Sequence, residues 1–251
     1  MKKILIPLLL SALPLLGWSA GPSIDLDKIR TDVTDTASLQ RGVQIYMNYC
    51  MGCHSLEYGR YNRVARDLKI PEDVFAENLI FTDAAIGSLM TNAMSRQDGS
   101  DWFGIAPPDL TLVNRVRGSD WLYTYMRGFY QDDSRPFGVN NVAFENVGMP
   151  HALLELQGLC AEPPTPITDR RFDPLTGRLI TEGGCSSYAI EGSMSTAEFD
   201  EAMYDLVNFL DYMGEPIQKE RERIGWMVLA FLTVFLVIGQ LLYRELWKDI
   251  H

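Results

Sequence analysis

The sequence of 251 residues predicts a mainly α-helical domain with long loop insertions, followed by one C-terminal transmembrane helix. Two kinds of observation support this fold class. Apolar residues recur at helical spacing in segments 37–50 and 195–213, and residues 224–243 contain no charged side chain. At a rise of about 1.5 Å per residue, this uncharged segment covers roughly the 30 Å of a bilayer's hydrocarbon core. A buried core helix is the alternative, but the length and purity of the segment favour a membrane span.

The N-terminus has the pattern of a secretory signal peptide. Two lysines precede an apolar stretch at residues 4–16, which is too short to span a bilayer and is interrupted by two prolines. Ala20 suits the last residue of a signal, although Trp18 stands where a small residue is expected, so cleavage after Ser19 is an alternative. We expect residues 1–20 to be the signal peptide; an uncleaved N-terminal anchor is the other interpretation.

The body of the chain, residues 21–215, has the length of one domain with a single hydrophobic core. The chain is acidic, with a formal net charge of −11. This charge argues against nucleic-acid binding and permits electrostatic steering of a basic partner. A charged link at 216–223 leads to the transmembrane segment 224–243. If the N-terminus is exported, residues 244–251 form a cytoplasmic tail.

The first predicted helix begins near Ala37 and ends in the motif Cys50-Met51-Gly52-Cys53-His54. Three polar residues are possible N-caps: Asp35, Thr36 and Ser38. Gly42 lies on the apolar face four residues before Tyr46, which lies four residues before Cys50. A glycine in such a place indicates that another backbone comes close.

The C-x-x-C-H motif is the attachment signature of c-type haem. Thiols spaced by three residues share one helical face and form thioethers with the two vinyl groups of the porphyrin. His54 lies four residues from Cys50 on that face, where its imidazole can reach the iron. A zinc half-site would need a second ligand pair, and a thioredoxin-like redox pair would need a βαβ context; the sequence shows neither. We therefore expect one covalent haem c, a one-electron carrier.

The sequence after the motif predicts short helices and loops. Residues 74–94 have weak helical periodicity, and Asp-Gly-Ser-Asp at 98–101 is typical of a turn. A further helix is expected at 120–129, where three aromatic residues are spaced by four: Trp121, Tyr125 and Phe129.

Two non-helical segments are candidates for the surroundings of the haem. In Ala106-Pro107-Pro108-Asp109-Leu110, two prolines fix an extended backbone without N–H groups, so Pro108 and its neighbours can lie flat against a porphyrin edge; an ordinary loop is the alternative. Met149, between Gly148 and Pro150, offers a thioether as a sixth ligand, which would raise the reduction potential. Most methionines fill gaps in cores, and Met194, also in a loop, is the best rival ligand.

Cys160 and Cys185 remain after the haem motif is assigned. An even remainder in an oxidising compartment favours a disulfide, and two free thiols are the alternative. The bond would close a loop of about 25 residues and stabilise the fold by roughly 3–4 kcal/mol in the chain-entropy model. The proline-rich start of this loop, residues 162–166, is expected to form no regular ladder.

The last helix of the domain has the clearest boundaries. Ser195 and Glu198 form a capping box, and Gly214 and Pro216 end the helix. Its apolar stripe consists of Phe199, Met203, Leu206, Leu210 and Met213.

The pattern Gly42-x-x-x-Tyr46-x-x-x-Cys50-x-x-Cys53-His54 resembles the N-terminal helix of class I c-type cytochromes. In that class this helix crosses the C-terminal helix at the glycine, and residues 195–213 would be the partner. The remaining features narrow the resemblance to the cytochrome c1 family, the haem c subunits of cytochrome bc1 complexes. These features are Ala106 to Leu110 with arginines downstream, Gly148-Met149-Pro150, Gly214-Glu215-Pro216 and the single C-terminal membrane segment.

The resemblance implies roles for individual residues. Cys50 and Cys53 would carry the thioethers, and His54 and Met149 would be the axial ligands. Arg117 matches an arginine near a haem propionate, where a guanidinium suits a carboxylate, and Arg115 could substitute for it. Two features depart from the family pattern: Met149 is followed by Pro-His rather than by alanine and prolines, and the placement of Cys160 and Cys185 is not a general family feature.

The resemblance also implies a function. The chain would be a non-catalytic electron carrier that accepts electrons from a Rieske iron–sulfur subunit and passes them to a soluble cytochrome c. It would lie beside cytochrome b in a dimeric multi-subunit complex, on the periplasmic side of a bacterial inner membrane. The rival is a membrane-anchored catalytic haem enzyme, such as a peroxidase or reductase, with His151 as acid/base. A thiol–disulfide oxidoreductase is a third possibility and would need free Cys50 and Cys53.

Overall fold

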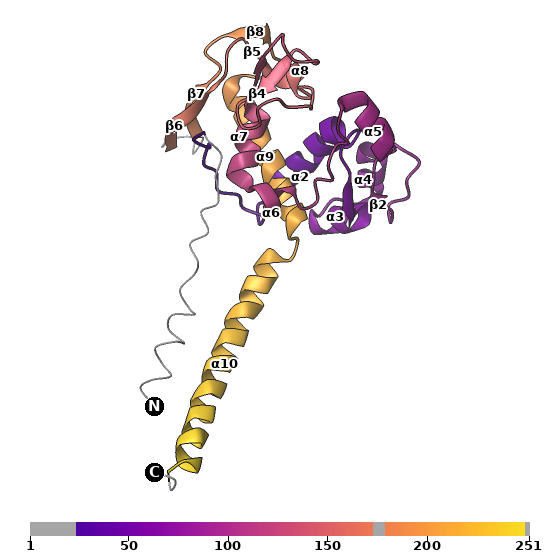
Figure 1. The fold of residues 1–251 in the computed structure, drawn as a ribbon. Helices are drawn as coiled ribbons and strands as arrows, with labels where there is room; N and C mark the ends of the chain where they lie inside the picture. Colours follow the sequence, from indigo (N-terminus) through magenta and orange to yellow (C-terminus); the bar gives the residue numbers. More distant parts are fainter. Residues whose placement is uncertain (1–23, 173–178, 249–251) are drawn as a thin grey trace.

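Two helices that lie far apart in the sequence cross at the centre of the haem-motif domain. The computed structural model describes residues 24–172 and 179–248, so the expected signal peptide at 1–20 lies outside the described residues. Helix α2 spans Thr36–Ile45 and helix α9 spans Thr196–Gly214. Helix α9 packs against α2 on one side and against α7 (Ser119–Arg127) on the other, as Figure 1 shows.

Gly42 lets α2 and α9 touch backbone to backbone. A Cβ atom added at Gly42 would lie 2.2 Å from the carbonyl oxygen of Asp205 and 2.6 Å from the Cβ of Phe209. No side chain fits in such a space without moving one helix. The close approach that the sequence predicted at this glycine is therefore confirmed, and its partner is the predicted C-terminal helix.

Both crossing helices begin at the caps that the sequence offers. Asp35 accepts a hydrogen bond from the Ser38 N–H at 3.1 Å, and Ser195 with Glu198 forms the expected capping box. Helix α2 continues as a five-residue π-helix, η1 (Tyr46–Cys50), which periodicity alone did not predict. Insertions of this kind are frequent at functional sites, and this one brings the haem motif to the end of the helix.

The segment after the motif forms a small helical layer. Strand β1 (Leu56–Arg60) pairs antiparallel with β2 (Leu89–Met90), and three helices accompany them: α3 (Tyr61–Asp67), α4 (Glu72–Leu79) and α5 (Arg96–Phe103). The weak helical periodicity over 74–94 was misleading beyond Leu79. The turn expected at 98–101 was also wrong, because Ser95 caps a helix there by accepting from the Asp98 N–H at 3.0 Å.

The segment from residue 113 to 191 forms the other side of the domain. Helix α6 (Val113–Arg117) leads into α7, and a four-stranded sheet follows with the order β4-β3-β5-β8. Strands β3 and β5 are parallel and the other two pairs are antiparallel. The elements of this part are β3 (Phe129–Gln131), β4 (Val139–Asn141), α8 (Leu154–Gln157), β5 (Gly158–Cys160) and β8 (Tyr188–Glu191).

The predicted disulfide is confirmed. Cys160 and Cys185 are bonded, with a Cα–Cα distance of 5.3 Å and a sequence separation of 25 residues. The expectation that residues 162–166 form no regular ladder is correct up to Pro164 and wrong for Thr165 and Pro166, which lie in a strand. Strands β6 (Thr165–Phe172) and β7 (Leu179–Gly184) pair as an antiparallel hairpin that begins directly after Pro164. Pro163 and Pro164 precede the ladder, whereas Pro166 lies in β6 at the irregularity between the paired residues Thr165 and Asp169, where a proline needs no ladder partner.

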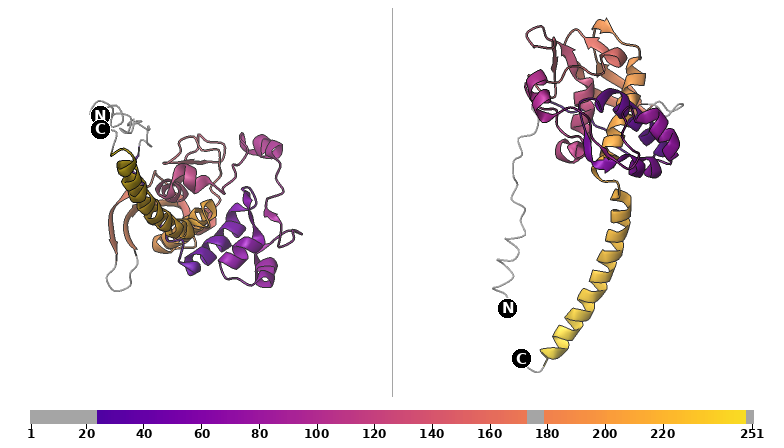
Figure 2. Two further views of the ribbon diagram at one scale, coloured as in Figure 1. Left: turned by 90° about the horizontal axis from the view of Figure 1, so that it is seen from below. Right: turned by 90° about the vertical axis from the view of Figure 1, so that its right-hand side faces the viewer.

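The C-terminal helix α10 spans Gln218–Leu246 and projects away from the domain, as Figure 1 and the right-hand view of Figure 2 show. It is long and apolar enough to cross a membrane, and none of its side chains is buried against the domain. The expected charged link at 216–223 is itself helical from Gln218. Glu215 pairs with Arg115 and with Arg221, so it joins α6, the end of α9 and the start of α10.

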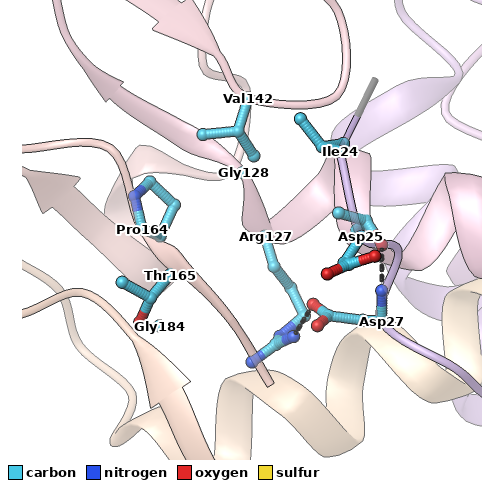
Figure 3. A pocket seen from close by; sticks show the side chains of 10 residues that line it. Ile24, Asp25, Asp27, Arg127, Gly128, Val142, Pro164, Thr165 and Gly184 are labelled. Atoms are coloured by element: carbon cyan, nitrogen blue, oxygen red, sulfur yellow. Dashed lines mark hydrogen bonds and ion pairs between the residues drawn. The ribbon is translucent and has the colours of Figure 1, made fainter. Parts of the chain in front are cut away.

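A cavity of about 150 Å³ lies beside the buried side chain of Arg127. In Figure 3, Arg127 points toward Asp27, with which it forms an ion pair; a second pair joins it to Asp200 on α9. The N–H of Asp27 also donates to the Thr124 hydroxyl at 2.8 Å. The residues that line this cavity include none of the predicted haem-site residues. This region therefore ties the N-terminal segment to α7 and α9.

Candidate haem site

The two thiols of the motif lie at the end of η1. The His54 N–H donates to the carbonyl of Cys50 at 2.8 Å, and the Cys53 N–H donates to the same carbonyl at 3.0 Å. This tight turn keeps Cys50, Cys53 and His54 together. Neither cysteine is in a disulfide, and Cys50 is buried while Cys53 is partly exposed. Burial raises the pKa of the Cys50 thiol to about 12, the opposite of the low pKa of a redox-active cysteine.

The imidazole of His54 is oriented by the proline segment. Its Nδ1 lies 2.8 Å from the carbonyl oxygen of Pro108. A carbonyl only accepts, so Nδ1 carries the proton and Nε2 keeps its lone pair for a metal. The Leu110 N–H donates to the carbonyl of Ser55 at 2.9 Å, which joins the proline segment to the motif. Burial lowers the pKa of His54, which favours the neutral form that a ligand needs.

Tyr46 packs under the haem motif and is hydrogen-bonded to it. Its side chain is fully buried, and its hydroxyl donates to the carbonyl of His54. The ring also lies against Phe209 of α9, with 5.7 Å between centroids. The sequence predicted that Tyr46 lies on the helical face of the motif but did not predict what its side chain contacts. The structure shows that it connects the motif to the helix crossing.

Met149 lies in a loop next to the chain that leads into the proline segment. Its sulfur is 3.3 Å from the hydroxyl of Tyr125, and its side chain is partly buried. A Cβ added at the neighbouring Gly148 would lie 3.3 Å from the carbonyl oxygen of Phe103 and 3.6 Å from Ile105. Residues 103–108 thus contact the Met149 loop at one end and His54 at the other. The two predicted axial ligands border the same segment of chain.

Met194, the rival ligand, lies elsewhere. It lines a small cavity together with Arg127, Cys185 and Phe199. Its N–H donates to the carbonyl of Leu156 at 3.0 Å, so its backbone is hydrogen-bonded to a residue of α8. Both methionines are partly buried against the core, but Gly148, beside Met149, lies close to the chain segment that reaches His54, which favours Met149 as the ligand.

Arg115 and Arg117, the two candidates for a propionate contact, have different surroundings in the structure. Arg117 is exposed, and its guanidinium lies 4.9 Å from the ring centroid of Trp121 and 6.0 Å from that of Phe144. Arg115 pairs with Glu215 at the junction with α10. A guanidinium held by a carboxylate is less available to a second carboxylate, so the geometry favours Arg117 for a propionate.

His151 does not have the setting of a catalytic acid or base. Its ring stacks on Phe129 with 4.6 Å between centroids, and its Nε2 lies 3.1 Å from the Gly158 carbonyl oxygen. Burial lowers the pKa of His151 to about 4. The residue is 7 % exposed, which is a poor position for a group that exchanges protons with a substrate.

The donor set fits a haem c better than a bare metal ion. Two unpaired thiols, one imidazole nitrogen and one thioether are the groups that such a haem uses. Among the residues that the structure describes, no three His, Cys, Asp or Glu side chains gather as a set that could hold a metal. The sequence placed Tyr125 in a helix but did not connect it with Met149, because only the tertiary fold brings the two residues together.

Comparisons with known proteins agree with this donor set. The model of the Cytochrome C1 family matches residues 27–79 and 184–250. The chain is 46 % identical to a cytochrome c1 of Allochromatium vinosum over the full length of both proteins. It is 40 % identical to a protein of Nitrosomonas europaea named ammonia monooxygenase gamma subunit, over all of this chain and 98 % of that protein. A cytochrome c1 of Cereibacter sphaeroides is 24 % identical over 86 % of this chain and 82 % of its own length. By its similarity to these full-length relatives, this chain belongs to the cytochrome c1 family.

Proposed function

We propose that this chain carries one haem c, bound through Cys50 and Cys53 and ligated by His54 and Met149, and that it relays single electrons from a Rieske iron–sulfur subunit to a soluble cytochrome c. Family membership makes it a non-catalytic electron-transfer subunit of a cytochrome bc1 complex. The observation that carries the haem assignment is the contact between His54 Nδ1 and the Pro108 carbonyl oxygen, which would leave Nε2 free to hold an iron.

The bound haem would supply a one-electron couple, and the protein's residues hold it in place. Pro108 fixes the tautomer and direction of the His54 ring. Tyr125 contacts the Met149 sulfur, which would hold the haem on the second side and keep exogenous ligands away from it. Arg117 would neutralise a propionate at the exposed edge, supported by its stacking on Trp121. A site with both axial positions filled transfers electrons and does not bind a substrate at the metal.

The same proposal assigns the ends of the chain. Residues 1–20 would be the signal peptide, 21–215 the periplasmic haem domain, 216–223 the link, 224–243 the membrane span and 244–251 the cytoplasmic tail of an inner-membrane protein. Helix α10 supports this topology, since it leaves the domain with its apolar side chains exposed. Those side chains would pack against lipid and cytochrome b in a dimeric complex.

A catalytic haem enzyme is the rival function, and the geometry argues against it. Such an enzyme needs an open sixth position and a polar group beside it. Met149 would fill that position, and His151 is stacked on Phe129 in the core.

A difference spectrum of the purified protein distinguishes the two functions. We expect covalent haem staining and a low-spin c-type spectrum that carbon monoxide does not alter. Ready binding of carbon monoxide would support the enzyme instead. Absence of covalent haem would exclude the assignment of Cys50 and Cys53.

Purification of the full chain from membranes in mild detergent tests the assembly. We expect a cytochrome b and a Rieske subunit to accompany it. Recovery with ammonia-oxidising subunits in their place would give this chain the assembly that the name of the Nitrosomonas europaea relative describes.

A further inference from the structure

The loop that carries Met149 and the strand before it contact helix α7 through two groups of one residue, the hydroxyl and the carbonyl of Tyr125. The Tyr125 hydroxyl lies 3.3 Å from the Met149 sulfur. Its carbonyl oxygen accepts a hydrogen bond from the Asn141 side-chain amide at 2.7 Å. We propose that Tyr125 and Asn141 are positioning residues that form a clamp, which orients the Met149 thioether and tunes it as a ligand. This inference rests on the proposed function, in which Met149 ligates the haem iron.

Asn141 fixes the start of the loop. It is 1 % exposed at the end of β4, and its Oδ1 accepts the Ala143 N–H at 2.9 Å while its amide reaches Tyr125. The next N–H, of Val142, donates to the carbonyl of Gly128 at 3.0 Å. A Cβ at Gly128 would lie 2.8 Å from a Val142 methyl, so the loop lies directly on the end of α7. Both polar ends of the Asn141 amide are used to hold the chain in this place.

The ring of Tyr125 cannot swing away from Met149. Trp121 stacks on one side of it, with centroids 4.9 Å apart and planes 17° apart, and Phe129 meets it edge-on at 5.4 Å. Trp121 and Tyr125 lie four residues apart on α7, and Phe129 follows four residues later as the first residue of β3. The hydroxyl is thereby aimed at the sulfur by packing, which costs little further entropy when the contact forms.

The far end of the loop is held independently. Arg135 donates to the carbonyl of Asn146 at 2.9 Å and to its Oδ1 at 3.1 Å. The Asn146 N–H donates to the side chain of Asn140 at 2.9 Å, and Asn146 has a left-handed backbone with φ of 62°. The loop is thus organised by the protein's own contacts on both sides of Met149. A ligand held this way requires no rearrangement when it binds the iron.

The hydrogen bond has an electronic consequence. A hydroxyl that donates to the thioether withdraws electron density from it, which makes the sulfur a poorer donor to ferric iron. The reduced state is then favoured. A neutral hydrogen bond has a net free energy that corresponds to a factor of about 2–12 in an equilibrium constant. Removing it should shift the ratio of reduced to oxidised protein toward the oxidised form by about this factor.

The test compares Tyr125→Phe with Tyr123→Phe by redox titration of the intact membrane-anchored protein. Tyr123 is the matched control, since it is also buried on α7 and its hydroxyl lies 3.5 Å from the Asp200 carbonyl oxygen. At a fixed ambient potential, we expect Tyr125→Phe to lower the reduced-to-oxidised ratio about 2–12-fold. The control should change this ratio less than about twofold.

A second variant tests the backbone arm of the clamp. Asn141→Ala should let the sulfur leave the iron transiently, so cyanide should bind the ferric protein at least about tenfold faster than it binds wild type, since the loop loses two buried hydrogen bonds. If Asn141→Ala fails to accumulate with haem, the Tyr125→Phe titration decides alone.

The outcomes separate the clamp from the proposed function. If Tyr125→Phe has the wild-type potential while Met149→Leu opens the iron to carbon monoxide, the clamp is wrong and the ligand assignment stands. If Met149→Leu itself behaves as wild type, the ligand assignment fails and the clamp fails with it.

Discussion

The protonation of one ring nitrogen, Nδ1 of His54, determines which nitrogen of this imidazole can bind a metal. His54 faces a proline carbonyl, and proline supplies no N–H that could compete for the same nitrogen. The proton therefore stays on Nδ1, and Nε2 keeps the lone pair that a metal would need. The sequence predicted the motif and the proline segment separately, but their contact across 54 residues of chain comes from the fold.

At the same scale, Met149→Leu tests the sixth ligand. Leucine keeps the volume of the side chain but has no sulfur, so we expect a sharp fall in the reduction potential and binding of carbon monoxide. Redox titration and the carbon monoxide difference spectrum measure the two effects. Met194→Leu is the control and should leave both unchanged. The reverse pattern would make Met194 the ligand.

Among the elements, helices α2 and α9 cross so closely that a side chain added at Gly42 has no space. The sequence predicted it well because a capping box, a glycine and an apolar stripe all indicated the same packing. Helix α5 and the β6–β7 hairpin were missed. In both, local residues typical of turns were overruled, by the Ser95 cap in one and by cross-strand pairing in the other. Contacts between distant segments, such as Tyr125 with Met149, left no periodic signal to find.

Gly42→Ala should destabilise the domain at this crossing. The added methyl would lie 2.2 Å from the Asp205 carbonyl oxygen, so the helices must separate, at a cost of about 1–3 kcal/mol or more. Denaturant unfolding followed by circular dichroism gives the free energy of unfolding. Gly87→Ala is the matched control, because the nearest atom to its added Cβ is 4.0 Å away. Equal stability of the two variants would contradict the backbone contact.

The disulfide stabilises the elements around β5. Replacing both Cys160 and Cys185 by serine should lower the free energy of unfolding by roughly 3–4 kcal/mol, since the bond closes a loop of 25 residues. Haem content should be unchanged, because the haem motif uses the other two cysteines. A stability equal to wild type would show that the hairpin holds itself closed without the bond.

Considered as a whole, the molecule is an acidic domain on a single helical stalk. The net charge of −11 creates a field that attracts a basic partner and weakens when salt screens it. We expect the rate of electron transfer to a basic soluble acceptor to fall steeply as ionic strength rises, as stopped-flow kinetics can measure. A rate that does not depend on salt would exclude electrostatic steering by this surface.

The burial of Cys50 has a consequence for the order of events during biogenesis. Its thiol lies in the core that α2 forms with α9, and α9 is among the last parts of the domain to be synthesised. A thiol enclosed by a finished core cannot react with a vinyl group. Under the proposed function, haem must therefore be joined to the exported chain while it is still open, and the closing of α9 over Gly42 is the step that ends this period. Maturation then requires covalent attachment to precede folding, and slow closure of the helix crossing would favour attachment.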